Sequence, residues 1–102
     1  MSRRSRPQAT PRAATHTVSW TLPALEQLAE IETFLDDDPG YAADVAAELV
    51  RAALSLNLFP GRGPVLDGEV RYLVVLDRYI LRYEHDDAQV DILGVRDGRR
   101  ER

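Results

Sequence analysis

The chain has 102 residues, of which 44% are hydrophobic and 29% charged, and a formal net charge of −4. This length supports one small domain with a single hydrophobic core. The sequence has no cysteine, which excludes disulfides and thiolate metal sites. No apolar run approaches the ~20 residues that cross a bilayer, and the N-terminus lacks the apolar segment of a secretory signal. We therefore expect a cytoplasmic protein with no membrane partner.

The charges are unevenly distributed, and all thirteen cationic side chains are arginine. Residues 1–17 carry four arginines and no acid, so the rest of the chain carries nine arginines against seventeen acids. A domain this acidic is a poor candidate for gripping a nucleic-acid backbone along a broad face. The absence of lysine excludes a lysine base or Schiff-base nucleophile. Because His16 and His85 lie far apart in the sequence, we expect no metal and no cofactor.

Residues 1–16 are rich in arginine, serine, threonine, alanine and proline and have almost no large apolar side chain. Such a segment cannot bury enough surface to offset its ordering entropy, so we expect a disordered basic tail. The alternative is a basic arm that touches nucleic acid through weak, salt-sensitive contacts. Residues 17–102 form the predicted domain.

The domain is predicted to begin with a strand at residues 17–20, followed by two helices. Thr21 is placed to cap the first helix, with Pro23 in its first turn. Apolar residues at spacings of three and four predict its buried stripe, which is Leu22, Leu25, Leu28, Ile31 and Leu35. Asp38 and Pro39 suit the start of the second helix, whose predicted stripe is Tyr41, Val45, Leu49, Ala52, Leu56 and Phe59. The sequence FPGRGP at 59–64 ends it.

Residues 69–102 alternate apolar and polar side chains in three short runs, which predicts an antiparallel meander. Two-residue turns at 77–78 and 86–87 would fix the register of the three strands. This register places on the core face Tyr72, Val74, Leu76, Tyr79, Leu81, Tyr83, Val90, Ile92 and Gly94.

The opposite face of the predicted sheet is about half apolar, although helices cover only one side. An uncovered apolar patch there would mark a protein-binding surface. We expect this patch to comprise Leu73, Val75, Ile80, Leu93 and Val95. Alternatively, the C-terminal tail or a loop folds over it.

The predicted register pairs Arg71 with Glu84 and Arg82 with Asp91 across the strands. Such ion pairs contribute a few tenths to about 1 kcal/mol each. An acidic or anionic partner is the alternative for Arg71 and for the tail arginines, which are Arg96, Arg99, Arg100 and Arg102.

The order of strand, two helices, proline-glycine loop and three-stranded meander resembles the RelE/ParE superfamily of toxins from bacterial type II toxin–antitoxin systems. The residues that carry the likeness are VSWTLPALEQLAEIETFL at 18–35, LFPGRGP at 58–64 and EVRYLVVLDRYILRYEHDDAQVDILGVRDGRR at 69–100. The resemblance implies an α+β fold of order β-α-α-β-β-β, with a two-helix hairpin packed on one face of a mainly antiparallel sheet.

Two activities divide this superfamily, because RelE-like members cut messenger RNA on the ribosome and ParE-like members inhibit DNA gyrase. Cleavage needs cationic and acid/base groups around the scissile phosphate. By position, Arg71 and either Arg96 or Arg99 match the RelE-like arginines. The lysines and the terminal tyrosine of that set are absent, and Asp97 stands where many relatives carry histidine.

The resemblance is therefore closer to ParE, which implies poisoning of DNA gyrase without catalysis by the toxin. We expect a cognate antitoxin to cover the half-apolar sheet face and the helix hairpin, and we expect no small-molecule substrate. The tail arginines named above are the candidates for target contacts. One alternative is a RelE-like endoribonuclease that uses Arg71, Arg96 and Arg99. Another is a toxin remnant that binds its partner but poisons nothing.

Overall fold

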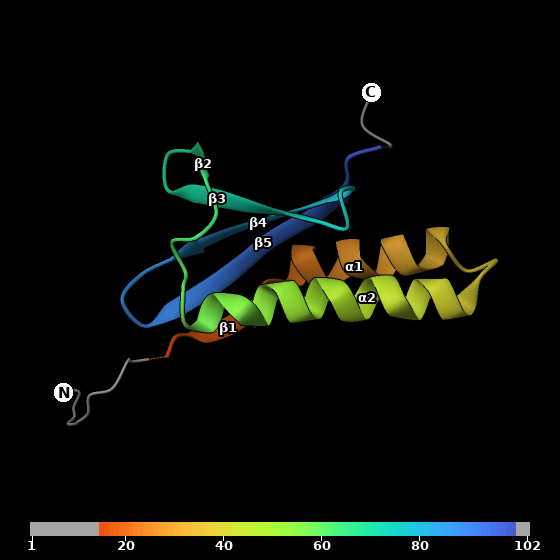
Figure 1. The fold of residues 1–102 in the computed structure, drawn as a ribbon, viewed down its shortest axis with the longest axis horizontal. Coiled ribbons are helices and arrows are strands. Elements are labelled where there is room, and N and C mark those ends of the chain that lie inside the picture. The colour runs from red at the N-terminus through yellow and green to blue at the C-terminus, as the bar shows by residue number, and fades with distance from the viewer. Residues whose placement is uncertain (1–14, 100–102) are drawn as a thin grey trace.

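The computed structural model describes residues 15–99 and has an α+β fold with two helices packed on a five-stranded sheet (Figure 1). The elements in chain order are β1 (Thr17–Trp20), α1 (Leu22–Phe34), α2 (Pro39–Leu54), the 3₁₀ turn η1 (Ser55–Asn57), β2 (Val65–Asp67), β3 (Val70–Val75), β4 (Tyr79–His85) and β5 (Gln89–Asp97). The predicted fold class is confirmed, and the short strand β2 is an addition to it. Most of the predicted basic tail lies outside the described residues.

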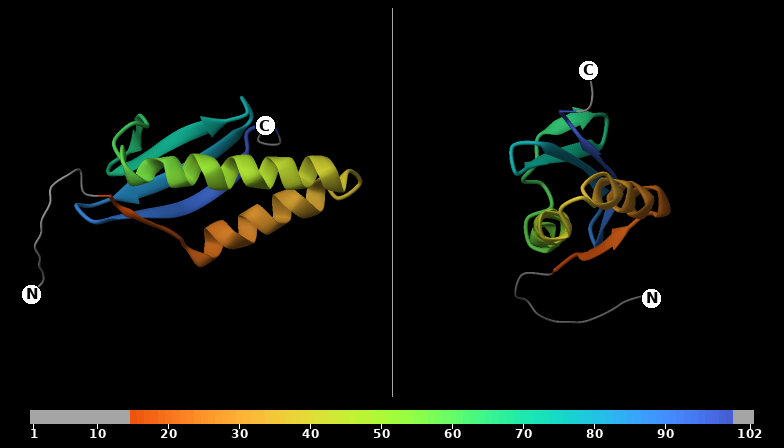
Figure 2. Two further views of the ribbon diagram at one scale, coloured as in Figure 1. Left: turned by 60° about the horizontal axis from the view of Figure 1, so that its bottom comes forward. Right: turned by 90° about the vertical axis from the view of Figure 1, so that its right-hand side faces the viewer.

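The strands are ordered β1-β5-β4-β3-β2 across the sheet. β1 pairs with β5 in parallel, whereas the other neighbours are antiparallel. The two helices form an antiparallel hairpin on one face of the sheet, as the turned views show (Figure 2). α1 packs against β5 and α2 against β3, so the hairpin crosses most of the sheet.

Both helices begin at the predicted caps. The Thr21 hydroxyl accepts a hydrogen bond from the Ala24 amide at 3.4 Å and donates to the Ile92 carbonyl at 2.8 Å. The Asp38 carboxylate accepts from the Tyr41 amide at 3.2 Å, with Pro39 as the first residue of α2. Each cap satisfies a backbone donor that would otherwise be unpaired. The Thr21 cap also ties the start of α1 to β5.

The hydrophobic core lies between the helix hairpin and the sheet. Its larger buried side chains are Ile31, Leu35, Val45, Leu49, Leu56, Leu73, Val75, Tyr79, Leu81, Tyr83, Val90, Ile92 and Val95. The predicted stripe of α1 is wrong at its first two residues and that of α2 at its first and last residues. Leu22 and Leu25 at the start of α1 are 68% and 47% exposed, and Tyr41 and Phe59 are also exposed.

α1 lies along the part of β5 that β1 leaves without a partner. β1 ends at Trp20, which pairs with Ile92, so β5 has no neighbouring strand on the β1 side beyond that point. In its place, the Gln27 side-chain oxygen accepts a hydrogen bond from the Val95 amide at 2.8 Å. A polar residue on the helix thus pairs a strand-edge donor that the sheet leaves free.

Candidate functional site

The β3–β4 hairpin differs from the predicted register by one residue. Val75 pairs with Tyr79 because the turn has three residues, 76–78, in place of two. Since side chains alternate between faces, a shift of one residue exchanges the two faces of β3. Leu73 and Val75 consequently face the helices, while Val74, which was predicted to be buried, is 56% exposed.

The β4–β5 hairpin also departs from the prediction. Its loop spans residues 86–88, where the Asp86 carboxylate accepts two backbone N–H groups at 2.8 Å, which lowers the pKa of Asp86. A β-bulge follows Arg82, which lies opposite Gly94 and not opposite Asp91. The predicted Arg82–Asp91 ion pair is therefore wrong. A bulge inserts one unpaired residue and changes which side chains share a face.

These shifts correct the predicted apolar patch. Leu73, Val75 and Val95 lie in the core, with exposed fractions of 8%, 7% and 1%, so their placement on an open face was wrong. Ile80 and Leu93 are half-buried. The outer sheet face therefore retains Ile80 and Leu93 of the predicted patch and gains the exposed Val74.

Arg71 holds the proline-glycine loop of residues 59–64 against the sheet. Its guanidinium donates to the carbonyls of Gly61 at 3.2 Å and Gly63 at 2.7 Å. Across the strands it lies opposite Tyr83, whose hydroxyl accepts from the Gly63 amide at 3.0 Å. The predicted pairing of Arg71 with Glu84 is therefore wrong, and the Arg71 guanidinium is engaged by the loop.

Arg78 and Asp97 form a bidentate ion pair that sequence reasoning missed. The guanidinium donates to the two carboxylate oxygens at 2.9 and 2.7 Å, and the side chains are only 16% and 4% exposed. The hydrogen bond to Asp97 raises the pKa of Arg78 above its ordinary value. The pair fastens the β3–β4 turn to the end of β5. It was missed because it depends on the register, in which Asp97 lies opposite Tyr79.

The RelE-like candidate arginines are divided between the two sheet faces. Arg71 shares the core-facing side with Tyr83, whereas Arg96 lies opposite Ile80 on the outer side. Arg96 and Arg99 are both exposed near the end of β5. The tail residues Arg100 and Arg102 lie outside the described residues. The sheet therefore separates Arg71 from Arg96.

A groove of about 560 Å³ runs between the two helices, and we call it the helix groove. Its apolar walls include Val50 and Leu54, which are 46% and 57% exposed. The full lining is Leu28, Glu32, Ala46, Ala47, Val50, Arg51 and Leu54. Val50 and Leu54 are four residues apart but lie off the predicted core stripe of α2, which is why the sequence did not single them out. Large exposed apolar patches are typical of protein-binding surfaces.

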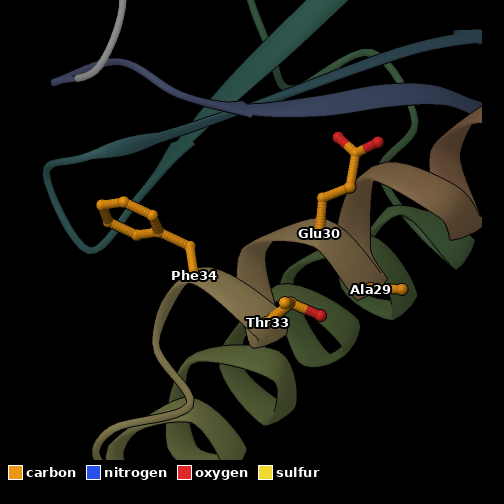
Figure 3. Close-up of a pocket in the computed structure, with 4 residues that line it drawn as sticks. All are labelled: Ala29, Glu30, Thr33 and Phe34. Atoms are coloured by element: carbon orange, nitrogen blue, oxygen red, sulfur yellow. The ribbon is translucent and has the colours of Figure 1, made fainter.

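A second pocket, of about 430 Å³, lies on α1 and is lined by Ala29, Glu30, Thr33 and Phe34 (Figure 3). Figure 3 shows Glu30 and Phe34 projecting on the side of α1 that faces the strands. The Glu30 carboxylate is the one titratable group among these four lining residues. A lone carboxylate does not supply the paired acid and base that a cleavage site needs.

The two histidines, distant in the sequence, meet at the β4–β5 loop. The ring centroids of His16 and His85 are 6.1 Å apart, and each ring has a nitrogen within 3.3 Å of the Asp86 carbonyl. Within residues 15–99, no three histidine, aspartate or glutamate side chains gather as a metal site. In the same residues, no helix has the length and apolar composition needed to cross a membrane.

The family described as "ParE toxin of type II toxin-antitoxin system, parDE" matches residues 18–102. Toxin RelE2 of Caulobacter vibrioides is 36% identical over 80 residues, which cover 78% of this chain and 91% of that protein. The fold resembles a chain of the chromosomal ParDE system of P. aeruginosa, with a TM-score of 0.73 and 18% identity over 82% of this chain and 97% of that one. It also resembles a chain of the Mycobacterium tuberculosis RelBE2 toxin–antitoxin complex, with a TM-score of 0.66 and 24% identity over 84% and 94% of the two chains.

Proposed function

Because the chain belongs to the ParE toxin family of type II toxin–antitoxin systems, we propose that it inhibits DNA gyrase and is neutralised by a cognate antitoxin. The family makes it a toxin of the RelE/ParE superfamily. The choice of gyrase over messenger RNA is the proposal. In this reading the toxin acts by binding, and it needs no catalytic residue, cofactor or metal.

The observation that carries this choice is the engagement of the candidate catalytic groups. Arg71 donates to two loop carbonyls, and Asp97 is held in a buried ion pair with Arg78. RNA cleavage needs a general base, a general acid and a cation that converge on one phosphate. Arg71 and Asp97 are committed to structural contacts, and Arg96 lies on the other face of the sheet from Arg71. This arrangement supports action by binding.

The test is a parallel assay of the purified protein. We expect inhibition of gyrase-catalysed DNA supercoiling and no codon-dependent cleavage of messenger RNA on translating ribosomes. An excess of antitoxin should restore supercoiling. This control distinguishes inhibition by the toxin from inhibition by a contaminating protein. Cleavage of messenger RNA without inhibition of supercoiling would overturn the proposal.

The second candidate function is a RelE-like endoribonuclease, and the similarity to Toxin RelE2 favours it. Exposed Arg96 and Arg99 would then contact the RNA, while Arg71 would hold the proline-glycine loop. Replacing both exposed arginines with methionine should abolish cleavage in that case. A protein that binds antitoxin but inhibits neither process would be the toxin remnant considered above.

The antitoxin is proposed to place an amphipathic segment in the helix groove. The groove is walled by apolar side chains and small alanines, so a helix or extended segment can approach its floor closely. The domain carries an excess of acids, which favours cationic residues on the flanks of that segment. Two residues of the predicted sheet patch, Ile80 and Leu93, are half-buried and remain available to extend this contact onto the sheet.

Two matched variants separate the helix groove from the outer sheet face. Val50 in the groove and Val74 on the sheet are similarly exposed, at 46% and 56%. Val50→Asp should weaken antitoxin binding by about 30-fold or more, because a central apolar contact is typically worth 2 kcal/mol or more. Val74→Asp should change it less than about threefold. The reverse ranking, measured by calorimetry, would place the antitoxin on the sheet.

A further inference from the structure

The turn between β3 and β4 places a leucine in a backbone conformation that leucine avoids. Leu76 and Asp77 have φ values of 58° and 54°. Left-handed backbone brings the side chain close to the following carbonyl, and hairpin turns that require it usually contain Asn-Gly or Asp-Gly. Aspartate tolerates this region through local hydrogen bonding, whereas a bulky apolar residue gains no such compensation. Leu76 is therefore the unfavourable residue of the turn.

The side chain of Leu76 does not offset this strain by entering the core. It is 49% exposed, while its neighbour Val75 is 7% exposed. The conformation is imposed by contacts on both sides, because the Arg78 amide donates to the Val75 carbonyl at 3.1 Å and the Gly98 amide to the Arg78 carbonyl at 2.8 Å. Glycine or asparagine would serve folding better at this position. Strained residues that folding does not require are concentrated at functional sites.

Leu76 forms one wall of a cavity of about 340 Å³ between the turn and α2. On the helix side the cavity is lined by Tyr41, which is 43% exposed, and by the buried Val45. The exposed Asp44 carboxylate flanks these apolar groups, whereas Glu48, which also lines the cavity, is ion-paired with Arg51. The combination fits a protein surface that presents an apolar side chain next to lysine or arginine.

We propose that Leu76 and Tyr41, with the flanking acid Asp44, form the surface through which the toxin binds its target protein. We call it the tip surface. The Arg78–Asp97 pair fixes the turn in advance, so little conformational freedom is lost when the target binds. The inference rests on the proposed function, so the occupant of the tip surface is DNA gyrase.

The tip surface also explains how the antitoxin neutralises the toxin. Ala47 and Arg51 line both this cavity and the helix groove, so the two surfaces adjoin along α2. An antitoxin segment in the helix groove therefore lies against the tip surface and excludes the target by overlap. Because the two surfaces bind different partners, we expect that a substitution in one surface can weaken its own interaction and leave the other intact.

The test is Leu76→Asn in the full chain, because asparagine accepts the left-handed backbone but removes the apolar side chain. We expect Tm to rise by about 4 °C as strain is relieved. Affinity for the antitoxin encoded beside the toxin gene should change less than about twofold. The amount of induced toxin that arrests growth should rise at least tenfold, and so should the concentration that half-inhibits gyrase supercoiling.

The matched control is Asp77→Gly, which relieves the same kind of strain one residue later and should raise Tm with toxicity unchanged. Growth arrest by Leu76→Asn at the parent's dose would overturn the inference and leave the proposed function standing. Loss of antitoxin affinity with toxicity retained would assign the surface to the antitoxin and also overturn it. So would a fall in Tm, since leucine would then be a structural residue. An inert parent protein would overturn the proposed function, and the inference with it.

Discussion

The two ends of the β3–β4 hairpin are each fastened by an arginine, but they differ in how completely their polar groups are paired. At the open end, Arg71 donates to two loop carbonyls, and the Tyr83 hydroxyl accepts from Gly63. At the turn end, Arg78 is locked to Asp97. There the backbone is left-handed at two residues, and among the described residues the Tyr79 hydroxyl has no partner.

This difference distinguishes a region arranged for stability from one that tolerates strain. The open end is closely packed around Gly63, and the polar groups named above are satisfied. The turn end retains an unfavourable leucine and an unpaired buried hydroxyl next to the Arg78–Asp97 pair. Strain persists only where surrounding contacts enforce it. It lies beside the surface that we assign to the target.

The largest expected effect comes from breaking the pair that holds the turn end. Asp97→Ala leaves the Arg78 charge mostly buried and should lower the free energy of unfolding by about 3–5 kcal/mol in urea titrations. Glu48→Ala is the control, because it breaks the exposed Arg51–Glu48 pair and should cost less than about 1 kcal/mol. Equal losses would show that burial of the ion pair does not govern the stability of the turn.

A nearly equal effect is expected at the open end. A Cβ on Gly63 would lie 2.3 Å from the Tyr72 carbonyl oxygen and 2.8 Å from the Tyr83 hydroxyl. Gly63→Ala should therefore lower the free energy of unfolding by about 3 kcal/mol, since backbone must move. Gly61→Ala, whose Cβ would meet nothing within 4 Å, should change it by less than about 0.5 kcal/mol. Similar losses for both would mean that the loop adapts freely.

The smallest expected changes in the free energy of unfolding come from two tyrosines on β4, Tyr79 and Tyr83, which are both fully buried. Tyr83→Phe leaves the Gly63 amide unpaired and should cost about 1–2 kcal/mol, whereas Tyr79→Phe removes an unpaired hydroxyl and should add about 1 kcal/mol. Urea titrations of the two variants measure both changes. A loss of stability in Tyr79→Phe would contradict the contrast between the two ends.

Tyr79 also predicts a dependence on pH. Burial raises the pKa of Tyr79 above its ordinary value, so the folded protein holds this proton more tightly than the unfolded chain. The protonated Tyr79 hydroxyl makes its full contribution to the free energy of unfolding below pH ~10. This contribution is lost as the pH rises through the folded pKa. The stability advantage of Tyr79→Phe should therefore widen above pH ~10. An advantage that stays constant through that range would show that the pKa of Tyr79 is the same in the folded protein and in the unfolded chain.

The sequence by itself determined the order of the two helices and the four longer strands, the two helix caps and the proline-glycine loop, but not the short strand β2. Those features depend on local chemistry: Thr21 and Asp38 accept backbone amides a few residues away, and residues 59–64 cannot continue a helix. The central turns of both helix stripes followed from helical periodicity. The family resemblance followed from the same order of elements.

Only the tertiary structure decided the strand register, and with it the candidate site. A third residue in the turn at 76–78 and a bulge after Arg82 moved Leu73, Val75 and Val95 from the expected open face into the core. The partners of Arg71 and Arg78 changed for the same reason. Strand side chains repeat every two residues, so one extra residue exchanges the faces. Packing against the helices, which no local pattern encodes, selects among the registers.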